Sequence, residues 1–445
     1  MPTRPTPPGL PTPLAALLDQ VEVARMRHDL QRLCAPELAG RRVGTPGHDH
    51  AAAWLAERLA QLGAIVTRQP VAVPAVMDLA AAPTLTVLER TDAAQLELTH
   101  RRHIAEHPRT APLAEPVTAT AHWLGADGDT GHTAAPPPPP ERGWGWVLVD
   151  PVPTDGLDRL AARLAAQGAV GLLVAQHPDP HGFLAKRLAG GTPLPLPVLA
   201  VRADLLTALD GRQVRVRVPV RRAAAHGTNI LGQRPGSDPN LAGAPLLLVA
   251  HYDGVGDDPQ QRLPGAGDNA TGVAVTLEAA RILTAATLPP RPVALALTDA
   301  EEVGALGAQV HARWLVAVGV RPLVVNLDMA GWLHEPVAVE ATPSPELTTP
   351  LLRALDRAGR WLGIRLAGGP VASDNRRYAA AGLAAVGLGL GARAYHSPAD
   401  TPDQVDDHAL RTAARLLLAT AWQLARNPEP AAEQANARRE GASRE

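Results

Sequence analysis

Residues 245–250, PLLLVA, form a continuous apolar run that ends directly before His251. Runs without polar alternation are typical of strands that are buried on both faces of a parallel sheet. Three similar runs follow, at 292–298 (PVALALT), 322–328 (PLVVNLD) and 384–390 (AAVGLGL). Apolar residues recur at helical spacing near 272–287, 303–319, 347–363 and 406–426. This alternation predicts an α/β fold, a three-layer sandwich with a mostly parallel central sheet between helices.

The sequence before residue 228 has a different character. Helical patterns over about 21–33 and 48–62 precede a strand-like stretch, and from about 75 to 222 short β-type runs alternate with Pro-rich loops. The chain has 445 residues, more than one compact core usually holds. We therefore predict a discontinuous α/β domain (26–75 and 223–427), a mainly β domain inserted into it (76–222), a Pro-rich N-terminal tail (1–25) and a disordered C-terminal tail (428–445).

The composition excludes several classes of partner. Lys and Arg number 42 against 44 Asp and Glu, and no basic block is present that would follow a nucleic-acid backbone. No stretch approaches the roughly 20 apolar residues of a membrane span. The N-terminus lacks the pattern of a signal peptide, which predicts a cytoplasmic protein, or a secreted or periplasmic one if the true start lies upstream. The sequence does not determine whether the protein forms an oligomer.

Polar side chains stand where the apolar runs end. His251 follows the first run and Asp328 ends the third, while Glu302 follows the second and His396 the fourth. Asp268 lies in the Gly-rich segment GAGDNATG. Any one of them alone is more often a loop cap or a surface group. Because the carboxyl ends of parallel strands meet at one edge of a sheet, we expect the set to form one site.

The residue types at this edge point to metal ions. Imidazole and carboxylate groups bind divalent ions in hydrolytic sites, and two ions about 3.5–4 Å apart need a bridging carboxylate. Five ligands with one shared carboxylate would hold two divalent ions. The sequence therefore predicts a two-metal hydrolytic centre.

Three further residues near these ligands suggest catalytic roles. Asp253 can accept the second imidazole N–H of His251, or can simply form an Asx turn. Glu301 is adjacent to Glu302, and neighbouring side chains diverge, so Glu301 can take a proton from water while Glu302 binds metal. An acidic helix N-terminus would explain one of the two glutamates. The phenol of Tyr395 can donate to an oxyanion, or can pack as an aromatic ring.

Several motifs together resemble one peptidase family. HYD, GAGDNATG, EEVGALGA, NLDMAG, SDN and YHSPADT are similar to the motifs of co-catalytic di-zinc peptidases, metallopeptidase family twenty-eight, which includes aminopeptidase Y, bacterial zinc aminopeptidases and glutamate carboxypeptidases. Residues 75–222 resemble the protease-associated (PA) domain often inserted in these enzymes. The resemblance covers about residues 26 to 426 and implies a zinc-exopeptidase fold.

The resemblance also implies which residues bind each metal ion and which take part in catalysis. One ion would be held by His251, Asp268 and Asp328, and the other by Asp268, Glu302 and His396. Glu301 would be the general base, and Asp253 would support His251. Zinc is the implied metal, with cobalt or manganese open because they accept the same ligands.

The family often has SDH where this chain has SDN at 373–375, and its usual aromatic residue nearby corresponds to Tyr378, after two arginines. We assign substrate binding to Asp374, Tyr378 and Trp332.

These features predict a metal-dependent exopeptidase, and specifically an aminopeptidase acting on peptides with a free N-terminus. A bridging hydroxide would attack the scissile carbonyl, with Glu301 as general base. A dipeptide carboxypeptidase, a glutaminyl cyclase and a non-catalytic receptor-like relative are the alternatives. The cyclase would not need both His251 and Asp328, and a receptor-like relative would have lost ligands, none of which is lost here.

Overall fold

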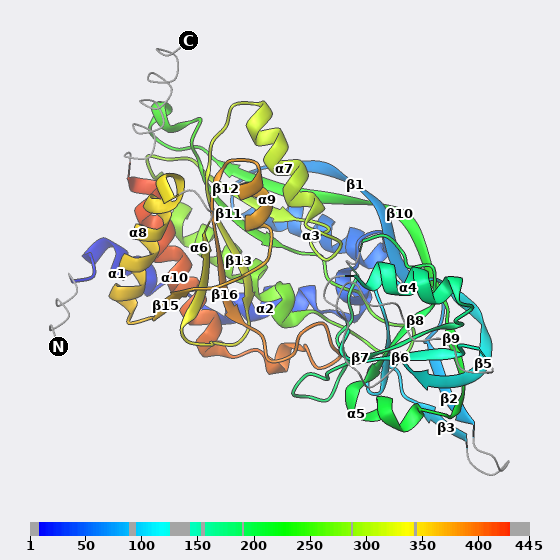
Figure 1. Cartoon of the computed structure of the whole chain (residues 1–445). Helices are drawn as coiled ribbons and strands as arrows, with labels where there is room; N and C mark the ends of the chain where they lie inside the picture. The colour runs from blue at the N-terminus through cyan, green and yellow to red at the C-terminus, as the bar shows by residue number, and fades with distance from the viewer. Residues whose placement is uncertain are drawn as a thin grey trace.

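The computed structural model describes residues 9–88, 95–124, 143–152, 156–188, 191–285, 288–341 and 345–427 (Figure 1). Their strands form two eight-stranded sheets. Within these residues, no helix is both long and apolar enough to cross a membrane.

The first sheet contains all four predicted apolar runs. In spatial order its strands are β1 (Ile65–Leu79), β10 (Val220–Arg234), β12 (Val293–Thr298), β11 (Leu246–His251), β13 (Leu323–Ala330), β16 (Ala384–Gly391), β14 (Val337–Ala341) and β15 (Leu366–Gly368). The central four, β12-β11-β13-β16, are parallel to one another, whereas β10 and β14 run antiparallel to their neighbours in this group. The predicted α/β fold with a mostly parallel centre is confirmed.

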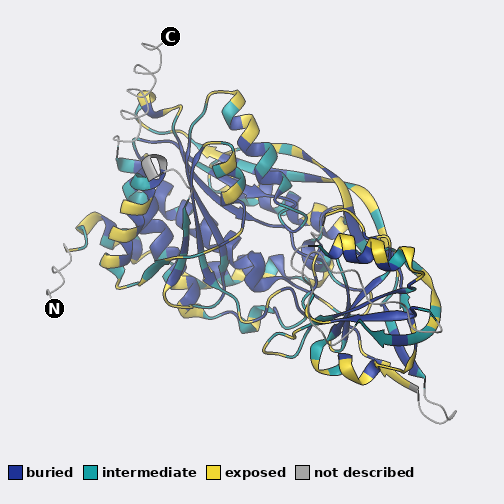
Figure 2. Cartoon of the chain, viewed as in Figure 1, coloured by how far each residue is buried: buried dark blue, intermediate teal, exposed yellow. Residues whose placement is uncertain are grey.

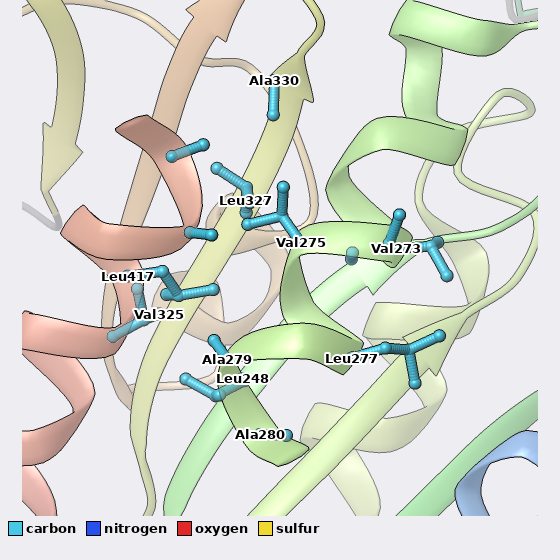
Figure 3. Close-up of a cluster of buried hydrophobic side chains, with 14 of the residues drawn as sticks. Leu248, Val273, Val275, Leu277, Ala279, Ala280, Val325, Leu327, Ala330 and Leu417 are labelled. Carbon is cyan, nitrogen blue, oxygen red and sulfur yellow. The ribbon is translucent and has the colours of Figure 1, made fainter. Parts of the chain in front are cut away.

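Helices cover both faces of this sheet. One face carries α2 (Val23–Leu33), α6 (Thr271–Ala285), α8 (Pro345–Leu362) and α10 (Asp407–Arg426), and the other carries α7 (Leu306–Ala317) and α9 (Asn375–Ala380). Side chains of β11 alternate between the two cores: Leu248 packs with α6, whereas Leu247 packs on the α7 side. Figure 3 shows Leu248 beside Ala279 of α6 in the larger core. Burial on both faces explains why the strands are continuously apolar.

The second sheet has its own core (Figure 2). Its strands, in spatial order, are β3 (Gln95–Leu98), β2 (Thr84–Leu88), β9 (Gln213–Val218), β5 (Leu113–Trp123), β6 (Trp146–Val149), β7 (Gly171–Gln176), β8 (Val198–Arg202) and β4 (Ile104–Glu106). Helices α4 (Leu157–Ala166) and α5 (Ala203–Leu206) accompany it. The chain enters this region after β1 and leaves it through β10, two long strands paired antiparallel (Figure 1). The PA assignment and the domain limits stay predictions.

The N-terminal region differs from the predicted tail. Residues Thr12–Leu18 form helix α1, in which Leu14 and Leu18 are buried against the large core, and α2 already begins at Val23. A proline within the first helical turn lacks only an N–H that would be unpaired anyway, so a Pro-rich stretch can begin a helix. The prediction of a tail over 1–25 was therefore wrong for the described part. Residues 1–8 and the predicted tail at 428–445 lie outside the described residues.

The remaining helices are short or near the N-terminus. Helix α3 (Pro46–Gln61) packs against β10 and β1. Short helical turns lie at Pro36–Arg41, Thr207–Leu209, Pro239–Leu241, Ala266–Ala270 and Pro402–Gln404. The turn at Ala266–Ala270 places Asp268 directly before α6.

Candidate metal centre

The five predicted ligands meet at the carboxyl edge of the parallel strands. His251 is the last residue of β11, and Asp328 lies near the end of β13. Glu302 lies in the turn after β12, His396 in the loop after β16, and Asp268 in the turn before α6. All five side chains are buried.

The five residues form two triads that share one carboxylate. Nε2 of His251 lies 3.2 Å from Oδ1 of Asp268 and 3.4 Å from Oδ1 of Asp328. Nε2 of His396 lies 3.0 Å from Oδ2 of Asp268 and 3.0 Å from Oε2 of Glu302. In each triad one atom of each residue lies within 4.8 Å of the others. Asp268 therefore presents one oxygen to each triad.

The donor atoms of these triads fit a pair of divalent cations. Among the described residues, His251 Nε2, Asp268 Oδ1, Glu302 Oε1 and Asp328 Oδ1 are buried without a hydrogen-bond partner. Burying polar atoms without partners is costly, and cations would satisfy them. Imidazole nitrogens with carboxylate oxygens are ligands that zinc and similar ions accept.

The electrostatics of the site reflect its excess of carboxylates. Burial alone lowers the pKa of His251, but the charge of Asp328 and further carboxylate contacts hold it well above its ordinary value. Burial raises the pKa of Glu302, and the charge of Asp268 adds to this effect. Burial raises the pKa of Asp268 as well, but its hydrogen bonds to His251 and His396 outweigh this and lower it. The carboxylates around the two histidines concentrate negative charge, which favours the binding of cations.

Asp253 contacts His251 and also holds the turn that follows β12. Nδ1 of His251 lies 3.3 Å from the main-chain oxygen of Asp253 and 3.6 Å from its carboxylate. The Asp253 carboxylate instead accepts the main-chain N–H groups of Glu301 (3.0 Å) and Glu302 (3.2 Å). The carboxylate therefore fixes the turn that carries both glutamates, and the imidazole hydrogen bond goes to the carbonyl.

Two supporting residues were missed by the sequence analysis. The carboxylate of Asp400 accepts the N–H groups of Gly267 (2.6 Å) and Asp268 (3.1 Å), and burial raises the pKa of Asp400 to about 7. The main chain of Lys186 is hydrogen-bonded twice to His396: its carbonyl accepts from Nδ1 and its N–H donates to the carbonyl, both at 2.8 Å. Lys186 is 210 residues away in the sequence, so local patterns gave no signal for this contact.

The residues around this centre match a known family. Residues 229–421, which include both triads, match the model of Peptidase family M28. A curated relative, the probable lipoprotein aminopeptidase LpqL of Mycobacterium tuberculosis, is 27% identical over 219 residues, which are 46% of this chain and 42% of that protein. The match therefore spans less than half of that relative.

Solved structures share the fold over nearly the whole chain. The aminopeptidase from Aneurinibacillus sp. strain AM-1 is 20% identical with a TM-score of 0.68, covering 94% of this chain and 97% of that one. The zinc aminopeptidase BSAP from Bacillus subtilis is 19% identical with a TM-score of 0.66, covering 92% and 96%. The peptidase M28 precursor from Shewanella amazonensis is 19% identical with a TM-score of 0.69, covering 93% and 96%. At these identities the likeness shows the fold alone.

A cavity of about 550 Å³ opens beside the two triads. Glu301, Glu302, Tyr395 and His396 line it. The ring of Tyr395 is 43% exposed and stacks on the ring of His396, with ring centroids 3.7 Å apart. Burial raises the pKa of Glu301 well above its ordinary value. The cavity therefore brings the predicted base and the predicted oxyanion donor to the same space.

The three predicted substrate-binding residues do not line this cavity. Tyr378 is fully buried in the α7-side core, where its hydroxyl is hydrogen-bonded to Nδ1 of His311 at 2.8 Å. Asp374 is fully buried and accepts a hydrogen bond from Thr298 Oγ1, and burial raises its pKa to about 7. Trp332 is half-buried under the guanidinium of Arg393, 3.6 Å from its ring centroid. The substrate-binding assignments of these residues stay predictions.

Helix α9 places neighbouring residues on different sides of the site. With 3.6 residues per turn, successive helical side chains point in directions about 100° apart around the axis. Tyr378 faces the core, whereas Arg376 and Arg377 line the cavity. Sequence analysis chose the aromatic residue and passed over the arginines before it.

Proposed function

We propose that this protein is a zinc-dependent aminopeptidase that hydrolyses the peptide bond next to a free N-terminus. The observation that carries the proposal is the pair of buried triads sharing Asp268 within an M28 domain. The names of similar proteins support the class: two of the solved structures are an aminopeptidase and a zinc aminopeptidase.

In the proposed site, one ion is held by His251, Asp268 and Asp328 and the other by Asp268, Glu302 and His396. When bound, such ions polarise a substrate carbonyl and lower the pKa of water. Asp268 orients one oxygen toward each position. Asp400 holds the Asp268 loop through two main-chain N–H groups.

The proton transfers are assigned to Glu301. Glu301 first acts as a general base and takes a proton from the attacking water. It then acts as a general acid and delivers that proton to the leaving amine. Its main-chain hydrogen bond to Asp253 fixes its position beside Glu302. The hydroxyl of Tyr395 donates to the oxyanion that forms on the scissile carbonyl.

We also infer that the M28 domain is discontinuous, with residues 76–222 as a PA-like insert. Lys186 of this insert holds His396 through two hydrogen bonds, so the insert takes part in building the proposed metal site.

The proposal is tested with purified protein reconstituted with zinc or cobalt. It is offered aminoacyl anilides with free N-termini, N-blocked peptides with free C-termini, and N-terminal glutaminyl peptides. We expect hydrolysis of the anilides and no turnover of the blocked peptides. Hydrolysis of the blocked peptides alone would make the protein a carboxypeptidase, and cyclisation of the glutaminyl peptides without hydrolysis would make it a cyclase.

A further inference from the structure

Three arginines line the cavity in front of the metal centre. Arg376 and Arg377 belong to α9 of the M28 domain, and Arg187 belongs to the loop between β7 and β8 of the second sheet. They share this cavity with Glu301 and His396. Two distant parts of the chain thus bring positive charge to one place.

The three arginines differ in their partners. Nε of Arg376 lies 2.8 Å from Oε1 of Glu340, so its charge is already paired. Nη2 of Arg377 donates to the carbonyl of Gly304 at 2.6 Å, which orients the guanidinium without neutralising it. Among the described residues, no carboxylate lies within ion-pair distance of Arg187 or Arg377. Two guanidinium charges at the cavity are therefore available to a ligand.

Arg187 is placed by its neighbour Lys186. The main chain of Lys186 is bonded on both sides to His396, and its buried Nζ lies 2.9 Å from Oδ1 of Asp258 and donates to the carbonyl of Gly256 at 2.8 Å. The backbone that carries Arg187 is therefore fixed against the M28 domain. A group held in advance loses less conformational freedom when it binds a ligand.

We propose that Arg187 and Arg377 bind a carboxylate of the substrate close to the scissile bond. This inference rests on the proposed peptidase function. The planar guanidinium matches a carboxylate with two parallel hydrogen bonds. The cavity of about 550 Å³ is in the range of sites for small ligands. Because Arg187, Arg377 and Glu301 line the same cavity, a carboxylate bound by the arginines belongs to the part of the substrate near the bond beside Glu301.

Two kinds of substrate present such a carboxylate. One is an aspartate or glutamate side chain at the cleavage position, and the other is the terminal carboxylate of a dipeptide. In either case the bound group is the same, and the substrates that carry it are acidic or very short peptides. The arms of the test separate the two.

The test compares kcat/KM for matched substrates of the zinc-loaded protein. Glutamyl and glutaminyl anilides are isosteric and differ in the side-chain charge, and a dipeptide and its C-terminal amide differ in the terminal charge. We expect at least one charged partner to be preferred by about 10-fold or more, as a charge-assisted hydrogen-bonded pair provides. Arg187→Gln and Arg377→Gln each remove most of that preference, whereas Arg68→Gln, an exposed arginine on β1, leaves it unchanged.

The outcomes separate this inference from the proposed function. Equal turnover of the charged and uncharged partners, or an equal loss on both in the two variants, would overturn the carboxylate site while leaving the aminopeptidase intact. If no substrate is cleaved, the proposed function fails, and calorimetric binding of glutamate against glutamine still decides the inference. Tighter binding of glutamate that disappears in Arg377→Gln supports the site, and equal affinities contradict it.

Discussion

Two buried clusters of charged residues lie on either side of His396, and they are built in opposite ways. The proposed metal centre combines three carboxylates with two histidines and has no lysine or arginine in either triad. The second cluster, which we call the clamp, consists of His100, Arg101, Glu106, Lys186 and Asp258. The clamp contains two permanent cations and two carboxylates, so its charges balance without an added ion.

The clamp is closed by short contacts. Nε of Arg101 lies 2.6 Å from Oδ2 of Asp258, Nζ of Lys186 lies 2.9 Å from Oδ1 of Asp258, and Arg101 also pairs with Glu106. Burial raises the pKa of Glu106, but the charge of Arg101 and a hydrogen bond to His100 outweigh this and hold the pKa well below its usual range. In the metal centre the pKa of Glu302 is raised instead. At Asp268, hydrogen bonds to His251 and His396 outweigh burial and lower the pKa. The two clusters therefore differ in the source of their positive charge, which is histidine in one and Arg101 with Lys186 in the other.

The largest effect should come from removing the proposed base without disturbing either cluster. In Glu301→Gln we expect kcat to fall by about 10²–10⁴, the usual contribution of a general base, with zinc content unchanged. Zinc content and anilide kinetics are measured together, and Glu57→Gln, an exposed residue of α3, serves as the control. Full activity with bound zinc would show that Glu301 is not the base.

Breaking the clamp should cost stability. Lys186→Met leaves the clamp with an uncompensated buried carboxylate, which typically costs about 3–5 kcal/mol, measured by urea unfolding of the metal-loaded protein. Arg25→Met removes an exposed pair with Glu22 and should cost under about 1 kcal/mol. Equal losses in the two variants would mean that the clamp is no stronger than a surface pair.

Tyr395 lies outside both clusters and should affect chemistry alone. In Tyr395→Phe the stacking on His396 can persist while the hydroxyl is lost. Removing one oxyanion donor lowers kcat by about 10²-fold or more, with little change in KM. A raised KM at constant kcat would assign Tyr395 to substrate binding.

Lowering the pH should reduce the stability that the clamp provides, gradually and by less than the substitutions above. In the folded protein the pKa values of Glu106 and Asp258 lie below the ordinary values of these carboxyl groups, 4.5 and 3.8. Their contribution to stability is therefore complete above those values and is lost as the pH falls through the lower folded values. Hydrogen exchange of metal-free protein should show the second sheet protected at about pH 5 and opening below about pH 4. Protection that does not change over this range would contradict the ion-pair account.

The sequence predicted the parts of the molecule that depend on local pattern. His251 and Asp328 follow or end apolar runs, so both the sheet and its functional edge were accessible from the printed residues. The supports of Asp268 and His396 were not, because Asp400 and Lys186 lie 132 and 210 residues away from the residues that they bond. Such contacts depend on tertiary packing, which no local period encodes.

Smaller differences from the predictions have the same origin. Residues Thr12–Leu18 look like a tail by composition, and only packing of Leu14 against the core makes them a helix. Tyr378 matches a family position by sequence, yet the orientation of α9 buries it and turns Arg377 to the cavity.

Metal stoichiometry tests the difference between the two clusters most directly. Zinc is measured per chain by elemental analysis after equilibration with a weak zinc buffer, for the wild type, His251→Ala and Asp268→Ala. We expect two ions per chain in the wild type, about one in His251→Ala, and near-complete loss in Asp268→Ala, because Asp268 presents an oxygen to both triads. One ion per chain in the wild type, unchanged in His251→Ala, would contradict the two-metal centre.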